Sequence, residues 1–305
     1  MSTPFVLLTL THGLAVLLMP FVLTGVINRT KSWWAGRKGP RLTQSFHDLR
    51  RLLGKRPVVS SVASPVFRMG AWAVLVTGLV VMGMSPLLGQ FAPLQFSHDF
   101  IAVAYTLGLG RLLLMLSAMD VGSPFEGMGA AREAMFGAFA EPALFLLIGT
   151  ASAATGLSSF ADLLGHLHHT PYYLLMVLPL TLALLILLQT EAARVPVDDP
   201  LTHLELTMIH EAMVLDHSGP LFSVILYAAS IKLLVLGTVL LHVIAPFEFG
   251  NAWLDWPLYI VEILGLSAII GILESVMARL QMRHVPYLLT GALLFCGFGF
   301  ILLIR

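Results

Sequence analysis

Several ionisable side chains lie inside, or at the ends of, long apolar stretches of this chain: Arg111, Asp120, Glu141, Glu191, Lys232, Glu262 and Glu274. An ionisable group at the bilayer centre costs about 2.5–3.5 kcal/mol on insertion scales, so such groups usually face the interior of a helix bundle. Their number predicts an internal path for protons or charge, with these candidates: Arg111, Glu141, Glu191, Lys232 and Glu274. Two plainer interpretations compete: snorkelling near helix ends, which suits Glu262 and Glu274 best, and a structural ion pair for Glu141 and Lys232.

The segment 194–220 is rich in acidic and histidine side chains, and Asp198 and Glu205 are its candidates for the same path. His203, His210 and His217 are spaced by seven, which places them on one face of a helix, with about 10.5 Å between neighbours. That separation is too large for a shared metal ion. We expect either a hydrated amphipathic helix or a protonatable lining, because histidines and buried carboxylates relay protons near neutral pH.

The sequence lacks the residues that metal, nucleotide and nucleophilic chemistry would require. Cys296 is the single cysteine, whereas an iron–sulfur cluster needs about four. There is no His-Glu-x-x-His, Walker A loop or GxGxxG context, and no nucleophilic triad. His166, His168 and His169 are best interpreted as surface residues. The sequence therefore predicts no catalytic residue, metal or cofactor of its own.

The composition indicates which elements position these residues: 57% of the chain is hydrophobic and 11% is charged. A soluble domain carries about twice that charge. Continuous apolar runs long enough to cross a bilayer predict helices, not a barrel, at about 5–27, 67–88, 100–119, 134–156, 172–193, 221–244, 256–277 and 286–304. We expect an all-α, polytopic membrane protein with about eight transmembrane helices and one integral membrane domain over 1–305. The first run is interpreted as a retained helix and not as a cleaved leader.

Positive charge is concentrated in alternate loops. The 28–66 loop is strongly basic, and Arg132, Arg194, Arg279 and Arg283 mark the other loops of that side, whereas 89–99, 157–171 and 245–255 contain no Lys or Arg. Because basic loops stay in the cytoplasm, the pattern predicts a multi-pass protein of the cell inner membrane with both termini outside.

The basic 28–66 loop contains leucines and a phenylalanine at helical spacing between Arg41 and Leu53, with basic residues on the other face. This predicts an amphipathic helix that either lies on the membrane surface or docks a partner. Candidate interface residues are Arg37, Lys38, Arg41, Arg50, Arg51, Arg132, Glu133, Arg194, Arg279 and Arg283. Apart from this loop no basic face is available, so nucleic acid is not an expected partner.

Three ordered stretches carry a family pattern: Gly36 to Leu53, Gly122 to Glu133 followed by Glu141-Pro142, and Glu191-Ala-Ala-Arg-Val-Pro-Val-Asp198. Together they resemble the respiratory complex I subunit 1 family. The nearest branch looks like the membrane-anchor subunit of group 4 [NiFe] hydrogenases, of the formate hydrogenlyase and hydrogenase-4 type.

The resemblance implies a non-catalytic subunit that joins a peripheral electron-transfer arm to ion-translocating membrane subunits. Glu141 and Glu191 match family carboxylates of the buried polar path, and Arg132, Arg194 and Asp198 match loop positions near the interface. Iron–sulfur clusters and a Ni-Fe centre are then expected on peripheral partner subunits, including one like the hydrogenase large subunit, with antiporter-like subunits and lipid as membrane neighbours. In the third motif Leu201 and His203 occupy positions that are usually glutamate, and Glu205 remains.

Two alternatives stay open. One is the quinone-site subunit of an NADH-quinone oxidoreductase, and the other is a stand-alone secondary transporter, against which the sequence shows no internal inverted repeat. The neighbouring genes would separate these: a nickel-ligating large subunit, NADH-oxidising subunits, or neither.

Overall fold

The computed structural model describes residues 3–87, 91–171, 173–198, 208–244 and 252–304, and within them the architecture is helical. The helices are α1 (Thr3–Trp34), α2 (Gln44–Leu53), α3 (Pro65–Met84), α4 (Asp99–Asp120), α5 (Pro124–Thr155), α6 (Phe160–His166), η1 (Leu167–His169), α7 (Tyr173–Glu191), α8 (His210–Met213), α9 (Gly219–Ile244), α10 (Ala252–Val276), η2 (Met282–His284) and α11 (Val285–Ile304). In these residues eight helices are long and apolar enough to cross a membrane, which confirms the predicted class and the eight predicted spans.

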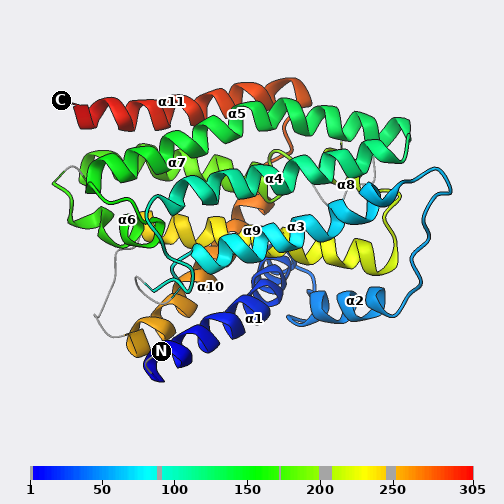
Figure 1. The fold of residues 1–305 in the computed structure, drawn as a ribbon, viewed down its shortest axis with the longest axis horizontal. Coiled ribbons are helices and arrows are strands. Elements are labelled where there is room, and N and C mark those ends of the chain that lie inside the picture. Colours follow the sequence, from blue (N-terminus) through cyan, green and yellow to red (C-terminus); the bar gives the residue numbers. More distant parts are fainter. Residues whose placement is uncertain (1–2, 88–90, 172, 199–207, 245–251, 305) are drawn as a thin grey trace.

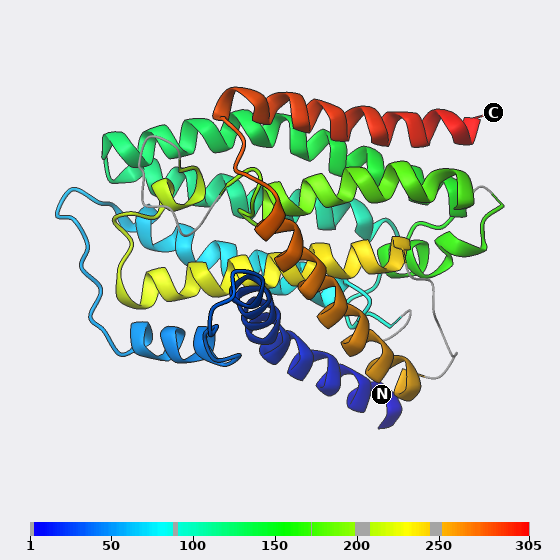
Figure 2. The same ribbon diagram turned by 180° about the vertical axis from the view of Figure 1, so that it is seen from behind.

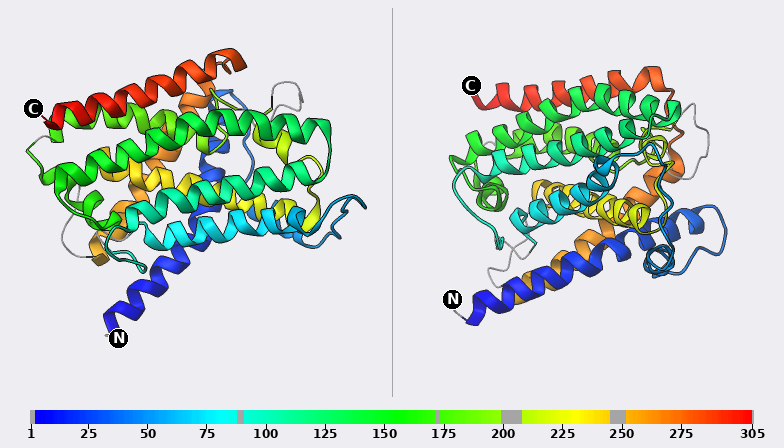
Figure 3. Two further views of the ribbon diagram at one scale, coloured as in Figure 1. Left: turned by 45° about the horizontal axis from the view of Figure 1, so that its top comes forward. Right: turned by 45° about the vertical axis from the view of Figure 1, so that its right-hand side comes forward.

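The long helices form one bundle. Both chain termini lie at one end, and α2 with its flanking loop lies at the other, which we call the polar end (Figure 1). Seen from behind, α10 runs obliquely beside α1 (Figure 2). The further views place α11 on the opposite side of the bundle (Figure 3). The apolar core joins α5, α7, α9 and α11, so the charged residues described below are held by helices anchored in that core.

Helix ends follow local sequence signals. Ser64 precedes Pro65 and accepts the N–H of Val66, which caps α3. α5 begins at Pro124 and ends before Gly156, which adopts a left-handed φ of 70°. The fourth span therefore begins at Pro124, not at about 134 as the apolar run predicted. Arg132 and Glu133, expected in a loop, consequently lie inside α5.

The close approach of α3 to α4 determines the direction in which Arg111 points. A Cβ on Gly110 would lie 2.4 Å from Thr77 Oγ1, and one on Gly70 would lie 2.3 Å from the Cβ of Ser117. Only glycine permits this approach of α3 to α4. Because α3 occupies that side of α4, the next residue, Arg111, is turned toward α5 and α7.

The amphipathic segment forms α2, which packs on α1 and α9. Ser45 Oγ lies 2.8 Å from Thr24 Oγ1, and the Phe46 ring meets the Phe21 ring edge-on at 5.5 Å. Leu42 and Leu53 stay exposed. Part of the apolar face of α2 is thus used inside this chain, and part remains for a membrane surface or a partner.

The histidine spacing was misleading in one respect. α8 ends at Met213, so His210 and His217 do not share a helix. His203 and Glu205 lie outside the described residues.

Candidate functional site

Arg111 is the centre of a buried group of charges. Its guanidinium contacts three carboxylates, each through a different nitrogen: Nε lies 3.2 Å from Glu133 Oε1, Nη1 donates to Glu141 Oε1 at 3.0 Å, and Nη2 donates to Glu191 Oε1. The Nε contact has ion-pair distance without hydrogen-bond geometry. A planar guanidinium is suited to this task because its donors point in fixed, different directions.

Glu191 also contacts a second cation, since Lys232 Nζ on α9 lies against its other oxygen. Glu191 is the last residue of α7, where the helix dipole disfavours a negative charge. Two cations offset that effect and the cost of burial. In formal charges, Arg111 and Lys232 face three carboxylates, which leaves one negative charge in excess when all three are ionised.

His210 and Asp198 extend this group toward the polar end. His210 Nδ1 lies 3.7 Å from Glu133 Oε2 and 4.0 Å from Asp198 Oδ2. Asp198 is held in place by the backbone N–H groups of Ile209 and His210, at 3.3 and 3.0 Å, and by Arg279 at 3.1 Å. We call Glu141, Arg111, Glu133, Glu191, Lys232, His210 and Asp198 the charge line.

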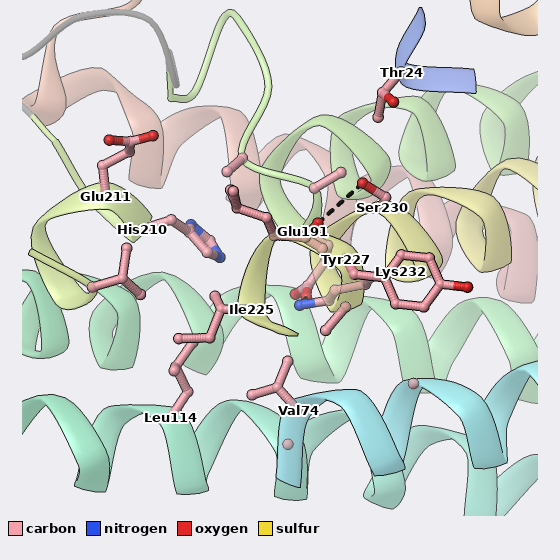
Figure 4. A pocket seen from close by; sticks show the side chains of 18 of the residues that line it. Thr24, Val74, Leu114, Glu191, His210, Glu211, Ile225, Tyr227, Ser230 and Lys232 are labelled. Carbon is pink, nitrogen blue, oxygen red and sulfur yellow. Dashed lines mark hydrogen bonds and ion pairs between the residues drawn. The ribbon is translucent and has the colours of Figure 1, made fainter. Parts of the chain in front are cut away.

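A cavity of about 440 Å³ borders the charge line. Its walls come from α1, α2, α3, α4, α5, α7, α8 and α9, and they include Arg111, Glu133 and Glu191. Figure 4 shows the Lys232 amine beside the Glu191 carboxylate, His210 at another part of the wall, and Val74, Leu114 and Ile225 as apolar lining. The charge line can therefore exchange with contents of this cavity.

Glu141 lies at the opposite end of the charge line and is half exposed, with 49% of its side chain accessible. Eight residues of helix place it about 80° around α5 from the buried Glu133, which explains the difference in exposure. Its Oε1 would lie 3.3 Å from a Cβ on Gly108 of α4. The charge line thus reaches the side of the bundle between α4 and α5, where lipid or another membrane protein would lie.

Glu274 belongs to a separate ion-pair group. Its fully buried carboxylate lies 2.8 Å from Lys31 Nζ and 3.4 Å from Arg194 Nη1. These contacts tie α1, α10 and the segment after α7 together. Lys31 and Arg194 also line the cavity, so Glu274 is connected to the charge line through the cavity and not by direct ion pairs.

The predicted site residues are thereby placed. Arg111, Glu141, Glu191, Lys232 and Asp198 come together, whereas Glu274 stands apart and Glu205 lies outside the described residues. Exposed residues of the predicted interface lie at the polar end: Arg37, Lys38, Arg41, Arg50, Arg51 and Arg283. Arg132 and Arg194 are partly buried; Arg132 Nη1 donates to the carbonyl of Met208 at 2.7 Å.

Two members of the charge line were assigned differently from the sequence. Glu133 was predicted at the interface, but it is 6% exposed and paired with Arg111. His210 was predicted as one of three helix-stacked histidines that form either a hydrated helix face or a protonatable lining, without a named partner. If the predicted fourth span had begun at Pro124, as α5 does, the sequence would have placed Glu133 and Glu141 on one helix. No group of three metal-ligating side chains occurs within the described part of the chain.

Within the part of the chain that the structure describes, eight membrane-length helices around a buried network of ion pairs define a polytopic helical membrane protein with a charged interior. A family model described as NADH dehydrogenase matches residues 7–305. The chain therefore belongs to this family, that of complex I subunit 1, as its motifs indicated.

Two Escherichia coli (strain K12) proteins are similar over nearly their whole length. Formate hydrogenlyase subunit 4 is 28% identical over 304 residues, covering 97% of this chain and 96% of that protein. Hydrogenase-4 component C is 26% identical over 296 residues, covering 93% and 92%. The fold is also that of a chain in the archaeal membrane-bound sulfane sulfur reductase complex, with a TM-score of 0.82, 18% identity and coverage of 97% and 99%.

Proposed function

We propose that this chain is the membrane-anchoring and coupling subunit of an energy-converting complex of the hydrogenase or formate hydrogenlyase type. In this proposal a peripheral arm carries electrons, and the charge line moves protons in response. The observation that carries the proposal is Arg111 bound to three carboxylates at once, in a chain similar to formate hydrogenlyase subunit 4.

The physical basis is electrostatic. Around Arg111 and Lys232, the three carboxylates leave one excess negative charge when all are ionised, so binding or losing one proton changes the net charge of this part of the charge line between zero and minus one. At an effective dielectric near 20, a unit charge about 8 Å away contributes about 2 kcal/mol. That energy changes a proton-binding equilibrium about 30-fold, so electron arrival at a nearby cluster can drive proton uptake.

The two ends of the charge line suggest its neighbours. The polar end carries the exposed basic residues expected to bind iron–sulfur and large-subunit-like peripheral subunits, and we assign it to the cytoplasmic side, which leaves both termini outside. Half-exposed Glu141 opens toward the membrane, where an antiporter-like subunit would accept or supply the proton. Charge complementarity supports such docking because it raises association rates and sets orientation.

The test replaces Glu141 by glutamine in the assembled complex. Glu141→Gln is expected to uncouple proton movement from electron transfer, or to block both, while assembly stays intact. Glu141→Asp should be milder because the charge survives on a shorter arm. Glu262→Gln is the matched control, since Glu262 lies inside α10 and outside the charge line.

Electron transfer and proton translocation would be measured on the same membranes. If Glu141→Gln shows wild-type turnover and wild-type translocation, Glu141 is only a structural partner and this path is wrong. If Glu262→Gln has the same defect as Glu141→Gln, the effect does not belong to the charge line.

One observation favours a second candidate function, a quinone site. The cavity of about 440 Å³ lies in the size range of small-molecule sites and combines apolar walls with charged groups. A photoreactive quinone analogue should then label Val74 or Leu114, with competition by unlabelled quinone. Absence of competed labelling would remove this candidate.

A further inference from the structure

Two buried titratable side chains lie near the polar end and outside the charge line. Glu126 is in the first turn of α5, and His217 is in the segment that leads into α9. Both side chains have 0% exposure, and His217 Nδ1 lies 4.0 Å from Glu126 Oε1. His217 also stacks on the Phe67 ring at 4.1 Å, which fixes the plane of its imidazole.

The hydrogen bonds determine where the imidazole carries its hydrogen. Ser117 Oγ donates its one hydrogen to the carbonyl of Phe67 at 2.7 Å, so it must accept from His217 Nε2 at 3.1 Å. The Nε2 atom is therefore protonated, and in the neutral ring Nδ1 is an acceptor. Burial lowers the pKa of His217 to about 4, which favours this neutral ring.

Each partner of this pair has one buried atom with no hydrogen bond: Nδ1 of His217 and Oε2 of Glu126. Glu126 Oε1 accepts the N–H of Asp216 at 3.0 Å. Both atoms that lack a hydrogen bond are satisfied if the carboxyl carries a hydrogen and turns so that its O–H comes within hydrogen-bond distance of Nδ1. A buried polar atom left without a partner costs about 1–3 kcal/mol, so this arrangement favours a bound proton.

The surrounding charges favour the same state. His217 is the only ion-pair partner of Glu126 in the described residues, at a distance too long for a hydrogen bond. Asp216 is exposed beside it, and the Asp120 carboxylate of α4 is bound by the Ser64 N–H and hydroxyl at 2.6 and 2.7 Å. Arg68, next to Phe67 on α3, is exposed. An unpaired buried carboxylate beside another acid, Asp216, is costly, whereas a neutral carboxyl is not.

We propose that Glu126 and His217 form a proton-binding site that holds one shared proton near neutral pH, separate from the charge line. The proton enters from the polar end and binds the Glu126 carboxylate; a rotation of the carboxyl that shortens its 4.0 Å separation from His217 Nδ1 then lets the O–H donate to that nitrogen. Uptake of one proton removes one negative charge, and its release restores the carboxylate.

Its place gives the site a role beyond the proposed function. Glu126 lies seven residues before Glu133 on the same face of α5, about 10.5 Å nearer the helix start. The site therefore lies between the polar end and the charge line, as a store for one proton. Ser218, next to His217, exchanges hydrogen bonds with the Val58 backbone at 2.8 and 3.0 Å, which links the site to the loop before α3.

Infrared spectroscopy on the full chain in lipid nanodiscs tests the proposal without requiring activity. A protonated carboxylic acid has a C=O stretching band that a carboxylate lacks. At neutral pH we expect one such band to disappear in Glu126→Gln and to move in His217→Gln, because an amide replaces the imidazole nitrogen as the hydrogen-bond partner. Asp216→Asn is the matched control, since this neighbouring carboxylate is exposed, and it should leave the band unchanged.

Identical carboxylic-acid bands in the wild type and Glu126→Gln would overturn the proposal, as would loss of the band in Asp216→Asn. Should Glu126→Gln not fold, Glu126→Asp keeps an acid at the position, and the band should persist at a shifted frequency. An unshifted band in Glu126→Asp would equally exclude Glu126 as its source. Failure of the charge-line proposal would leave these spectra unaffected, so the two proposals fail separately.

Discussion

Replacing Gly137 by alanine is a sharp test of the Arg111 contacts, because it disturbs one of them without removing a charge. A Cβ at position 137 would lie 2.6 Å from Arg111 Nη1 and 3.3 Å from Arg111 Cδ. Ordinary contact begins at 3.4 Å, so Nη1 must move by about 0.8 Å, the difference between 3.4 and 2.6 Å. The guanidinium cannot swing freely, since Glu133 and Glu191 also hold it.

The displacement can be expressed as an energy. Moving Nη1 away from Glu141 by that amount lengthens the 3.0 Å contact to at most about 3.8 Å, beyond hydrogen-bonding distance. At an effective dielectric near 20 the attraction falls from about 5.5 to about 4.4 kcal/mol, a loss of about 1 kcal/mol. An equilibrium that depends on this contact then changes about sixfold.

A control is needed because alanine itself favours a helix over glycine by about 1 kcal/mol. Gly149 lies on the same helix, and a Cβ there meets nothing within 4 Å. The Gly149→Ala protein should therefore be more stable than the wild type, and the Gly137→Ala protein should be less stable than the Gly149→Ala protein by about 1 kcal/mol. Thermal unfolding in nanodiscs measures the difference, and coupled proton translocation in the assembled complex should be impaired only in Gly137→Ala.

A double-mutant cycle identifies the contact responsible. If Gly137→Ala acts through the contact between Arg111 and Glu141, combining it with Glu141→Gln should cost little more than Glu141→Gln alone. Fully additive effects, or a Gly137→Ala protein as stable and as coupled as Gly149→Ala, would refute this account of the site.

Three further predictions concern docking, metals and pH. Reversing Arg50 and Arg51 to Glu should release the peripheral arm from purified membranes; full retention of the arm with unchanged activity would contradict the docking role. The chain expressed alone should contain no stoichiometric iron, nickel or zinc by elemental analysis, and one tightly bound equivalent would overturn our view of its histidines. Because the pKa of His217 is about 4 in the fold against 6.5 for the free side chain, its contribution to stability is complete above about pH 6.5 and is lost toward pH 4, by roughly 3 kcal/mol. Thermal unfolding of His217→Gln should not show this loss of stability at acid pH. If His217→Gln keeps the wild-type dependence of stability on pH, His217 is not the source of the loss.

Composition and apolar run length were sufficient to predict the helical membrane architecture. Lipid leaves few options for a backbone that must satisfy its own hydrogen bonds, so continuous apolar runs specify spanning helices. Helix ends were less predictable. The fourth span begins at Pro124 because polar residues such as Glu126 and Glu133 point inward at the start of α5, where a hydropathy window treats them as loop.

For the site, residue type alone indicated Arg111, Glu141, Glu191 and Lys232. Ionisable groups are costly inside a bilayer, so those that occur there usually have a function. The partners of these residues could not be deduced from the sequence. Glu191 contacts Arg111 from 80 residues away along the chain, and such a pairing depends on how α4, α5, α7 and α9 pack.

The sequence by itself determined the class of protein, its family and most members of the charge line, since bilayer energetics and local motifs act on short stretches of chain. The tertiary structure alone decided that Arg111 joins three carboxylates, that Glu141 reaches the side of the bundle while Glu133 is buried, and that Glu126 meets His217. The reason is geometric: these contacts depend on helix rotation and on close approaches such as that at Gly110, and a rotation of a few tens of degrees would separate every pair.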